Sequence, residues 1–288
     1  MEDQRPSRTA MVVALIRADH ARKSQSPLLN DFWAEKLIPA EFVAELPRFA
    51  SSDAELEQWL ARGGLRVNVI LRARYCEDQL REAVRGGVGQ YVIVGAGFDS
   101  LAWRRPQWAQ GLAIFELDHP ATQNLKVKQL RAAGADLDQA SFIAVDLRDV
   151  AIDQALAPSA YDPERPAFFA WLGVTRYLTR EANAAALAAM GRAAAAGSRL
   201  VLSYAPATSS RAIESGEDED RSKATLASWG EPWVSSFTQA EMAQMVGEAG
   251  FVVDEDLSHE DLVARYKNQG AEALGRASNG RLMLAVRV

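Results

Sequence analysis

The pattern of apolar and polar positions divides the chain into a helical N-terminal part and a longer part of alternating short apolar runs and helices. The apolar residues that recur at helical spacing in the first part are Leu56, Leu60, Val67, Ile70 and Leu71. Ser52 and Glu55 have the spacing of a capping box, which marks a helix start. Residues 68–84 form a second amphipathic pattern, which Gly86-Gly87 ends because paired glycines are poor helix formers. We therefore expect an N-terminal helical cap over residues 1–88.

From residue 90 onward, continuous apolar runs alternate with helical patterns, of which 180–195 is the clearest. The runs are 91–94, 113–117, 141–145, 167–172, 198–204, 251–257 and 281–288. Continuous apolar runs are typical of strands that are buried on both faces, and strands that alternate with helices form an open, doubly wound sheet. The pattern predicts one α/β domain over residues 89–288 with a seven-stranded, mostly parallel sheet.

One connection in this domain is much longer than the others. It joins Tyr204, at the end of a predicted strand, to Thr238 and Glu241, which have capping-box spacing. Loops longer than about 15 residues in a compact domain are usually lids, binding loops or disordered segments. After a run of acids this connection carries Trp229 and Trp233, whose rings are expected to pack against other groups rather than lie in solvent. We therefore expect a lid insertion at about 205–237.

Composition and charge exclude several classes of protein. With 288 residues, 48% hydrophobic and 24% charged, the chain is an ordinary globular protein. Its formal net charge of -6 argues against a nucleic-acid partner. The longest stretch without a charged residue is 86–98, against the roughly 20 apolar residues of a membrane helix. One cysteine, Cys76, excludes an intramolecular disulfide and a thiolate metal cluster. We expect a cytoplasmic protein with no membrane partner and no metal.

The candidate chemistry lies where the first three predicted strands end. Gly95, Ala96 and Gly97 follow the first strand, and such a turn lets the backbone approach a ligand closely. Glu116 and Asp118 end the second strand, where an acid accepts hydrogen bonds from ribose hydroxyls. Asp146 and Leu147 end the third, and an acid beside an apolar residue suits the amine and ring face of adenine. Together they predict an adenosine-containing cofactor.

Features that these motifs lack favour one kind of cofactor over another. The dinucleotide fingerprint has a third glycine where this chain has Ser100. None of the six tyrosines is followed by lysine four positions later, as a short-chain oxidoreductase would require. S-adenosyl-L-methionine (SAM) carries no phosphate, so its loop needs room only for the amino-acid and sulfonium end. The sequence therefore favours methyl transfer. An NAD-type oxidoreductase and a non-catalytic cofactor-binding protein stay open as alternatives.

Several motifs carry a family resemblance that extends over almost the whole chain. They are Ser7-Arg8-Thr9-Ala10, Arg72-Ala73-Arg74-Tyr75, Val94-Gly95-Ala96-Gly97-Phe98-Asp99-Ser100, Phe115-Glu116-Leu117-Asp118-His119-Pro120, Val145-Asp146-Leu147, the segment 171–179, Gly230-Glu231-Pro232-Trp233 and Ala264-Arg265-Tyr266. Through them the chain resembles the leucine carboxyl methyltransferase-like family of class I SAM-dependent methyltransferases, which includes bacterial and polyketide-type O-methyltransferases. The resemblance implies a Rossmann-like class I fold and SAM as the cofactor.

The resemblance also implies roles for matching positions. Arg72 would grip the carboxylate of the cofactor's methionine part, and Gly95 with its neighbours would line that end. Asp118 would hold the ribose, and Asp146 with Leu147 would hold adenine.

Two positions depart from the family pattern. The motif's Asp-Thr-Arg is Asp99-Ser100-Leu101 here. Leu172 stands where the eukaryotic carboxyl methyltransferases have a glutamate, which puts one polar cofactor contact in doubt. The same departure weakens any transfer of their substrate, a protein C-terminus.

The expected acceptor is an oxygen of a small metabolite, preferably a carboxylate. A carboxylate is ionised at pH 7, so alignment and exclusion of water suffice and no general base is required. A hydroxyl acceptor would need a base. The candidates are His20, His119 and His259, of which we interpret His119 as a turn or helix-start residue and His259 as a surface group.

Four further residues are candidates for contact with the acceptor. Tyr177 follows the fourth strand and Tyr204 ends the fifth, so either ring is a candidate wall of the active site, although a buried packing role is equally open for both. Arg17 and Arg265 are candidates for binding an anionic acceptor. No residue is assigned a catalytic role in proton transfer.

Overall fold

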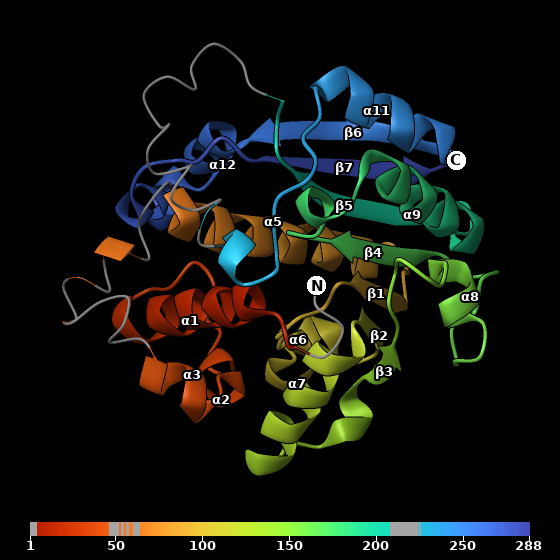
Figure 1. Cartoon of the computed structure of the whole chain (residues 1–288). Coiled ribbons are helices and arrows are strands. Elements are labelled where there is room, and N and C mark those ends of the chain that lie inside the picture. The colour runs from red at the N-terminus through yellow and green to blue at the C-terminus, as the bar shows by residue number, and fades with distance from the viewer. Residues whose placement is uncertain are drawn as a thin grey trace.

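The computed structural model describes residues 5–45, 52, 55, 58–59, 64–207, 224 and 226–288, and its centre is a seven-stranded sheet (Figure 1). The strands are β1 (Gln90–Val94), β2 (Ala113–Asp118), β3 (Ser141–Ala144), β4 (Ala167–Trp171), β5 (Arg199–Tyr204), β6 (Phe251–Ser258) and β7 (Arg281–Arg287). Their order is β3-β2-β1-β4-β5-β7-β6. Each predicted apolar run matches one of these strands to within one residue at either end, so the seven-stranded sheet is confirmed.

The first five strands are parallel, and β7 runs antiparallel to both β5 and β6. The parallel strands therefore present their carboxyl ends along one edge of the sheet. In the antiparallel part, Arg281 at the start of β7 pairs with Tyr204 of β5 on one side and with Ser258 of β6 on the other. This pairing brings the end of the fifth strand next to the start of the last one at the same edge.

Helices cover both faces of the sheet (Figure 1). On one face lie α5 (Leu65–Arg85), α6 (Leu101–Arg104), α7 (Pro120–Ala132) and α12 (His259–Arg265). On the other lie α8 (Ile152–Leu156), α9 (Arg180–Ala193) and α11 (Gln239–Glu248). Short 3-10 turns complete the chain: η3 (Gln107–Ala109), η4 (Leu137–Gln139), η5 (Thr175–Tyr177), η7 (Lys267–Gln269) and η8 (Ala271–Leu274).

Alternating side chains of the central strands feed two separate apolar clusters. In β4, Phe168 and Ala170 pack on the α5 side, whereas Phe169 and Trp171 pack on the α9 side. Successive side chains of a strand point to opposite faces, and both faces are buried here. This is why the strands appear in the sequence as continuous apolar runs rather than as alternating ones.

The N-terminal part shares its core with the sheet. It contains α1 (Arg8–Lys23), α2 (Ala34–Leu37), α3 (Ala40–Glu45) and α5. Tyr75 and Leu80 of α5 lie in the same apolar cluster as Tyr91 of β1. The predicted boundary at residue 88 therefore does not mark a break in the core.

The predicted helix starts agree with the structure where it describes them. Both halves of the capping box at Thr238 are formed, and α12 begins at His259 behind a second box at Ser258. The backbone N–H of Glu55 donates to Ser52 Oγ at 3.3 Å, while Leu56 and Leu60 lie outside the described residues.

Of the predicted lid, the structure describes residues 205–207, 224 and 226–237, and we call the segment 226–237 the strap. Residues 208–223 and 225 lie outside the described part of the chain. The end of the strap joins the continuation of β5, because Phe237 N donates to Ala205 O at 3.0 Å and Ala207 N donates to Phe237 O at 2.8 Å. In the part of the chain that the structure describes, no helix is both long and apolar enough to cross a membrane.

Candidate active site

A cavity of about 1770 Å³ lies at the carboxyl ends of β1, β2, β4 and β5. Side chains of α1, α5, the strap and the segment 276–281 also line it. Sites for single small molecules usually measure roughly 300–1,000 Å³, so this cavity has room for a cofactor together with a second ligand. The predicted site residues that line it are Arg17, Arg72, Gly95, Ala96, Gly97, Asp118, Asp146, Leu147, Tyr177 and Tyr204.

The loop after β1, residues 95–99, turns tightly against its surroundings. Gly95 and Gly97 have φ angles of 72° and 52°, in the left-handed region that favours glycine. A Cβ at Gly95 would collide with Val174, and one at Gly97 would lie 3.1 Å from Ala10 Cβ. These glycines therefore let the backbone pass close to Val174 and to α1 while the loop lines the cavity.

Asp118, at the end of β2, holds this glycine loop and still faces the cavity. Its carboxylate accepts from the backbone N–H of Gly97 and, at 2.6 Å, from that of His119. Burial raises the pKa of this carboxyl. A carboxylate has about four lone-pair sites, so both oxygens are able to accept further hydrogen bonds from a ligand.

The end of β3 supplies a second carboxylate beside an apolar residue. Arg148 Nη2 lies 2.5 Å from Asp146 Oδ2, and hydrogen bonds from Arg148 lower the pKa of Asp146 to about 2. Leu147 lines the cavity next to it. His119 Nδ1 accepts from Ala121 N at 3.3 Å, so His119 caps the N-terminus of α7, in agreement with its interpretation as a helix-start residue. An ionised acceptor beside an apolar surface is the arrangement expected for adenine.

Arg72 of α5 places a guanidinium cation in the wall of the cavity. Its Nη1 donates to Asn68 Oδ1 at 2.9 Å, and among the described residues no carboxylate forms an ion pair with it. Gly173, with φ 74°, lets the guanidinium approach, since a Cβ there would lie 2.9 Å from Arg72 Nη1. Burial lowers the pKa of Arg72 to about 10. Because a desolvated cation without a counter-charge is costly, this position favours a ligand carboxylate.

Two of the predicted site residues, Glu116 and Arg265, are ion-paired away from the cavity. Glu116 lies two residues before the carboxyl end of β2, under α7, where it is 1% exposed and forms an ion pair of 2.5 Å with Lys126. It does not line the cavity. Arg265, in the last turn of α12, is paired with Glu255 of β6 at 2.6 Å and does not line the cavity either.

The three histidines differ from the expectation in one case. His259 is buried at 1% exposure rather than on the surface, with Nδ1 2.5 Å from Ser278 Oγ, and burial lowers its pKa to about 3. His20 Nε2 accepts from Leu28 N at 3.1 Å, away from the cavity. His119 is the histidine that lines the cavity among the described residues.

The two candidate tyrosines both line the cavity. Tyr177 ends η5, the turn that follows β4. Tyr204 is 2% exposed, and its hydroxyl donates to Asp256 Oδ2 at 2.7 Å, while Arg281 Nε donates to Asp256 Oδ1 at 3.0 Å. Tyr204 is therefore a fixed part of the wall, which agrees with both the wall and the packing interpretation.

Sequence reasoning missed a clasp between the strap and the first helix. Glu231, 6% exposed, accepts from Ser7 Oγ at 2.8 Å, Arg8 N at 2.7 Å and Thr9 N at 3.4 Å, all at the N-terminus of α1. The strap is also bonded to η5, since Val234 N donates to Arg176 O at 2.7 Å. Glu231 was visible only as part of a family signature. Its partners lie more than 220 positions away in sequence.

Replacing Glu231 with glutamine is expected to destabilise the protein by about 1–2 kcal/mol. The change removes a negative charge and charge-assisted hydrogen bonds from a helix N-terminus, which the helix dipole favours. Chemical denaturation measures the effect, and Glu248→Gln, at the exposed end of α11, serves as the control. Equal free energies of unfolding for the two variants would show that the clasp does not stabilise the fold.

Sequence comparison with known proteins gives the family that the motifs of this chain resemble. The leucine carboxyl methyltransferase family model matches residues 10–191. YktD of Bacillus subtilis, whose name gives SAM-dependent methyl transfer as its expected activity, is 31% identical over 279 residues, 91% of each chain. Rv3399 of Mycobacterium tuberculosis, named for the same activity, is 33% identical over 230 residues. That match covers 78% of this chain and 64% of the longer relative.

Solved structures agree in fold. A protein of Thermobifida fusca named for expected methyltransferase activity superposes with a TM-score of 0.61 at 16% identity and covers 98% of this chain and 95% of its own. The magnesium protoporphyrin IX methyltransferase of Synechocystis, solved with bound S-adenosylhomocysteine, has a TM-score of 0.50 at 15% identity, covering 85% and 98%. At such identities the likeness shows the fold alone. With the family model matching more than half of the sequence, this chain belongs to the leucine carboxyl methyltransferase family of class I SAM-dependent methyltransferases.

Proposed function

We propose that this protein transfers a methyl group from SAM to an oxygen of a small anionic metabolite, by preference a carboxylate. The observation that carries this proposal is the guanidinium of Arg72, which lines the cavity without a carboxylate partner among the described residues. Asp118 and Asp146 lie along the same edge of the sheet. A ligand with a carboxylate at one end and a nucleoside at the other matches this order of charges. The family match does not favour an oxidoreductase or a non-catalytic protein.

The side chains have separate tasks in this proposal. Arg72 and the glycine loop hold the amino-acid end, Asp118 accepts from the ribose, and Asp146 with Leu147 holds adenine. The bound cofactor supplies a methyl group on a sulfonium, which an acceptor oxygen displaces in one step. The clasped strap and α1 exclude water from this part of the cavity, so that alignment can act in a dry site.

We place the acceptor beside Tyr204, and that part of the cavity favours a carboxylate over a neutral hydroxyl. His119 lies at the end of β2, whereas Tyr204 lies at the end of β5, three strand spacings away and therefore about 14 Å along the sheet. A carboxylate acceptor needs no base at that position. Arg176, whose guanidinium lies 4.1 Å from the ring centroid of Trp233, adds positive charge on the same side. An acceptor that carries a negative charge fits these surroundings.

A labelled-methyl screen tests the proposal. The wild-type protein is incubated with methyl-labelled SAM and separate sets of carboxylic acids and phenols, and the product is then treated with alkali. A methyl ester releases its label as methanol under these conditions, whereas a methyl ether keeps it. We expect alkali-labile product from the carboxylic acids. Label that stays in a phenol ether would contradict the carboxylate preference, and no transfer to any acceptor would contradict the enzyme assignment.

A further inference from the structure

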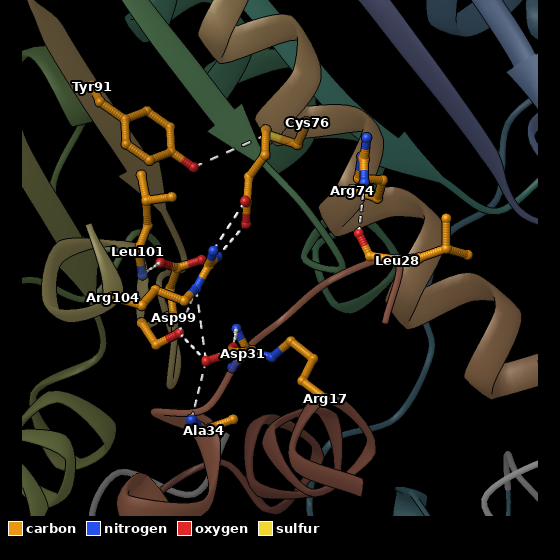
Figure 2. Close-up of polar contacts among 12 residues, drawn as sticks. Arg17, Leu28, Asp31, Ala34, Arg74, Cys76, Tyr91, Asp99, Leu101 and Arg104 are labelled. Atoms are coloured by element: carbon orange, nitrogen blue, oxygen red, sulfur yellow. Dashed lines mark hydrogen bonds and ion pairs between the residues drawn. The ribbon is translucent and has the colours of Figure 1, made fainter. Parts of the chain in front are cut away.

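A buried polar network joins the N-terminal part of the chain to the glycine loop (Figure 2). Arg17 comes from α1, Asp31 from the segment just before α2, and Arg104 from α6. All three side chains point toward one another beneath the loop in Figure 2. Their side chains are 5%, 0% and 7% exposed. Arg17 also lines the cavity, but its guanidinium is occupied by the protein itself.

Arg17 forms a two-pronged contact. Its Nη2 donates to the backbone carbonyl of Phe98 at 2.6 Å, and its Nη1 lies 3.1 Å from Asp31 Oδ2. Phe98 follows Gly97 directly, so this contact holds the glycine loop by its backbone. The planar guanidinium makes both contacts from a fixed fork, which an ammonium group does not reproduce. The sequence-based interpretation of Arg17 as an acceptor ligand is therefore replaced by a contact to the loop.

Asp31 holds the other end of the same loop. Its Oδ1 accepts from Ser100 Oγ at 2.5 Å and from Ala34 N at 3.0 Å. Although burial acts to raise the pKa of Asp31, the nearby guanidiniums of Arg17 and Arg104 and the Ser100 hydrogen bond lower it. An ionised Asp31 thus anchors both Arg17 and the residue that follows Asp99.

Arg104 closes the network from the side of α5. It forms a two-pronged ion pair with Glu77, with Nη1 3.0 Å from Oε2, and its Nε donates to Ser100 Oγ at 3.1 Å. Leu101 is buried, and the guanidinium that reaches Ser100 from α6 is that of Arg104. The backbone from Phe98 to Ser100 is therefore fixed from α1, from the turn before α2 and from α5.

We propose that Arg17 and Asp31 are positioning residues for the cofactor site. A loop with two glycines at positive φ has many alternative conformations, and external contacts are needed to select one. Arg17 fixes Phe98 and Asp31 fixes Ser100, so the backbone of residues 95–99, which lines the cavity, is held in one conformation for the amino-acid end of the cofactor. The N-terminal part then acts on cofactor affinity from below the loop. This inference rests on the proposed function.

The test uses two variants, at Arg17 and at Ser100, and a control at Asp19, which lies on the same helix as Arg17. Arg17→Lys keeps the charge but loses the fork, and Ser100→Ala removes the hydrogen bonds of Ser100 Oγ with Asp31 and Arg104. Asp19→Asn is the matched control, because Asp19 of α1 is also buried and ion-paired, with Lys23 at 2.7 Å and Arg66 at 3.3 Å, but does not line the cavity. Hydrogen exchange of a peptide covering residues 95–101 is measured in cofactor-free protein, and S-adenosylhomocysteine affinity is measured by calorimetry.

We expect faster exchange of this peptide and about 10-fold weaker binding for Arg17→Lys, and a smaller change in the same direction for Ser100→Ala. Asp19→Asn is expected to leave both readouts unchanged even if it lowers the melting temperature. Unchanged exchange and affinity in both loop variants would overturn the inference, and so would an equal loss in Asp19→Asn. Failure of the wild type to bind S-adenosylhomocysteine would instead overturn the proposed function, while the exchange comparison would still decide on the loop contacts.

Discussion

Replacing Arg72 with methionine is expected to weaken the binding of S-adenosylhomocysteine by about 100-fold while the cofactor-free protein stays folded. Removing one partner of a buried, hydrogen-bonded charge pair typically costs roughly 2–5 kcal/mol of binding free energy. In the cofactor-free protein Arg72 has an amide partner, Asn68, but no carboxylate partner among the described residues. Its removal therefore relieves a desolvated charge instead of breaking an ion pair, and the free energy of unfolding is expected to stay equal or to rise.

The matched control for this prediction is Arg74→Met, two positions along the same helix. Arg74 pairs with Asp78 at 2.9 Å and donates to Leu28 O at 2.8 Å, and it does not line the cavity. We expect the opposite outcome there, namely lower stability with unchanged affinity. Calorimetric titration and chemical denaturation of both variants measure the two quantities. Wild-type affinity in Arg72→Met would remove Arg72 from the cofactor site.

The second large effect is expected for Asp118→Asn, with a loss of S-adenosylhomocysteine affinity of about 100-fold or more. The carboxylate accepts from the N–H groups of Gly97 and His119 and still faces the cavity. An amide replaces one acceptor oxygen with a donor, which leaves a buried N–H group without a partner and costs roughly 1–3 kcal/mol in addition to the lost ligand contact. Asp138→Asn, on an exposed turn, is the control.

The pH dependence of the same site has a definite sign. Burial raises the pKa of Asp118, so its carboxylate is protonated at a higher pH than in the unfolded chain. Above that pKa the ionised carboxylate therefore lowers the free energy of unfolding, and this penalty disappears as the pH falls through the pKa. Cofactor affinity of the wild type is expected to fall over the same acidic range, because the acceptor oxygens are lost. Asp146, with its pKa at about 2, does not titrate there. An unchanged affinity over that range would contradict this role of Asp118.

The sheet and the cofactor edge were predictable from the sequence because both depend on local patterns. Strands buried on both faces produce continuous apolar runs, and each run ends where the chain turns at the edge of the sheet. The glycines after β1 and the acids after β2 and β3 are adjacent to such runs. Their order along the edge is that of the strands they follow, β3-β2-β1.

The ion pairs were not predictable, because their partners are brought together only by the fold. Arg17 and Arg265 appeared available for an acceptor, but Asp31 and Glu255 neutralise them in the folded chain. Glu116 appeared equivalent to Asp118 by its spacing from the glycines, yet Lys126 of the next helix covers it. A count of charged residues in a sequence does not show which of them form ion pairs within the folded protein.

The most direct test of the account is a calorimetric titration of the wild-type protein with S-adenosylhomocysteine and, separately, with NADH. The account predicts saturable binding of S-adenosylhomocysteine at one site per chain and no binding of NADH. Tight binding of NADH, with no response to S-adenosylhomocysteine or SAM, would contradict it.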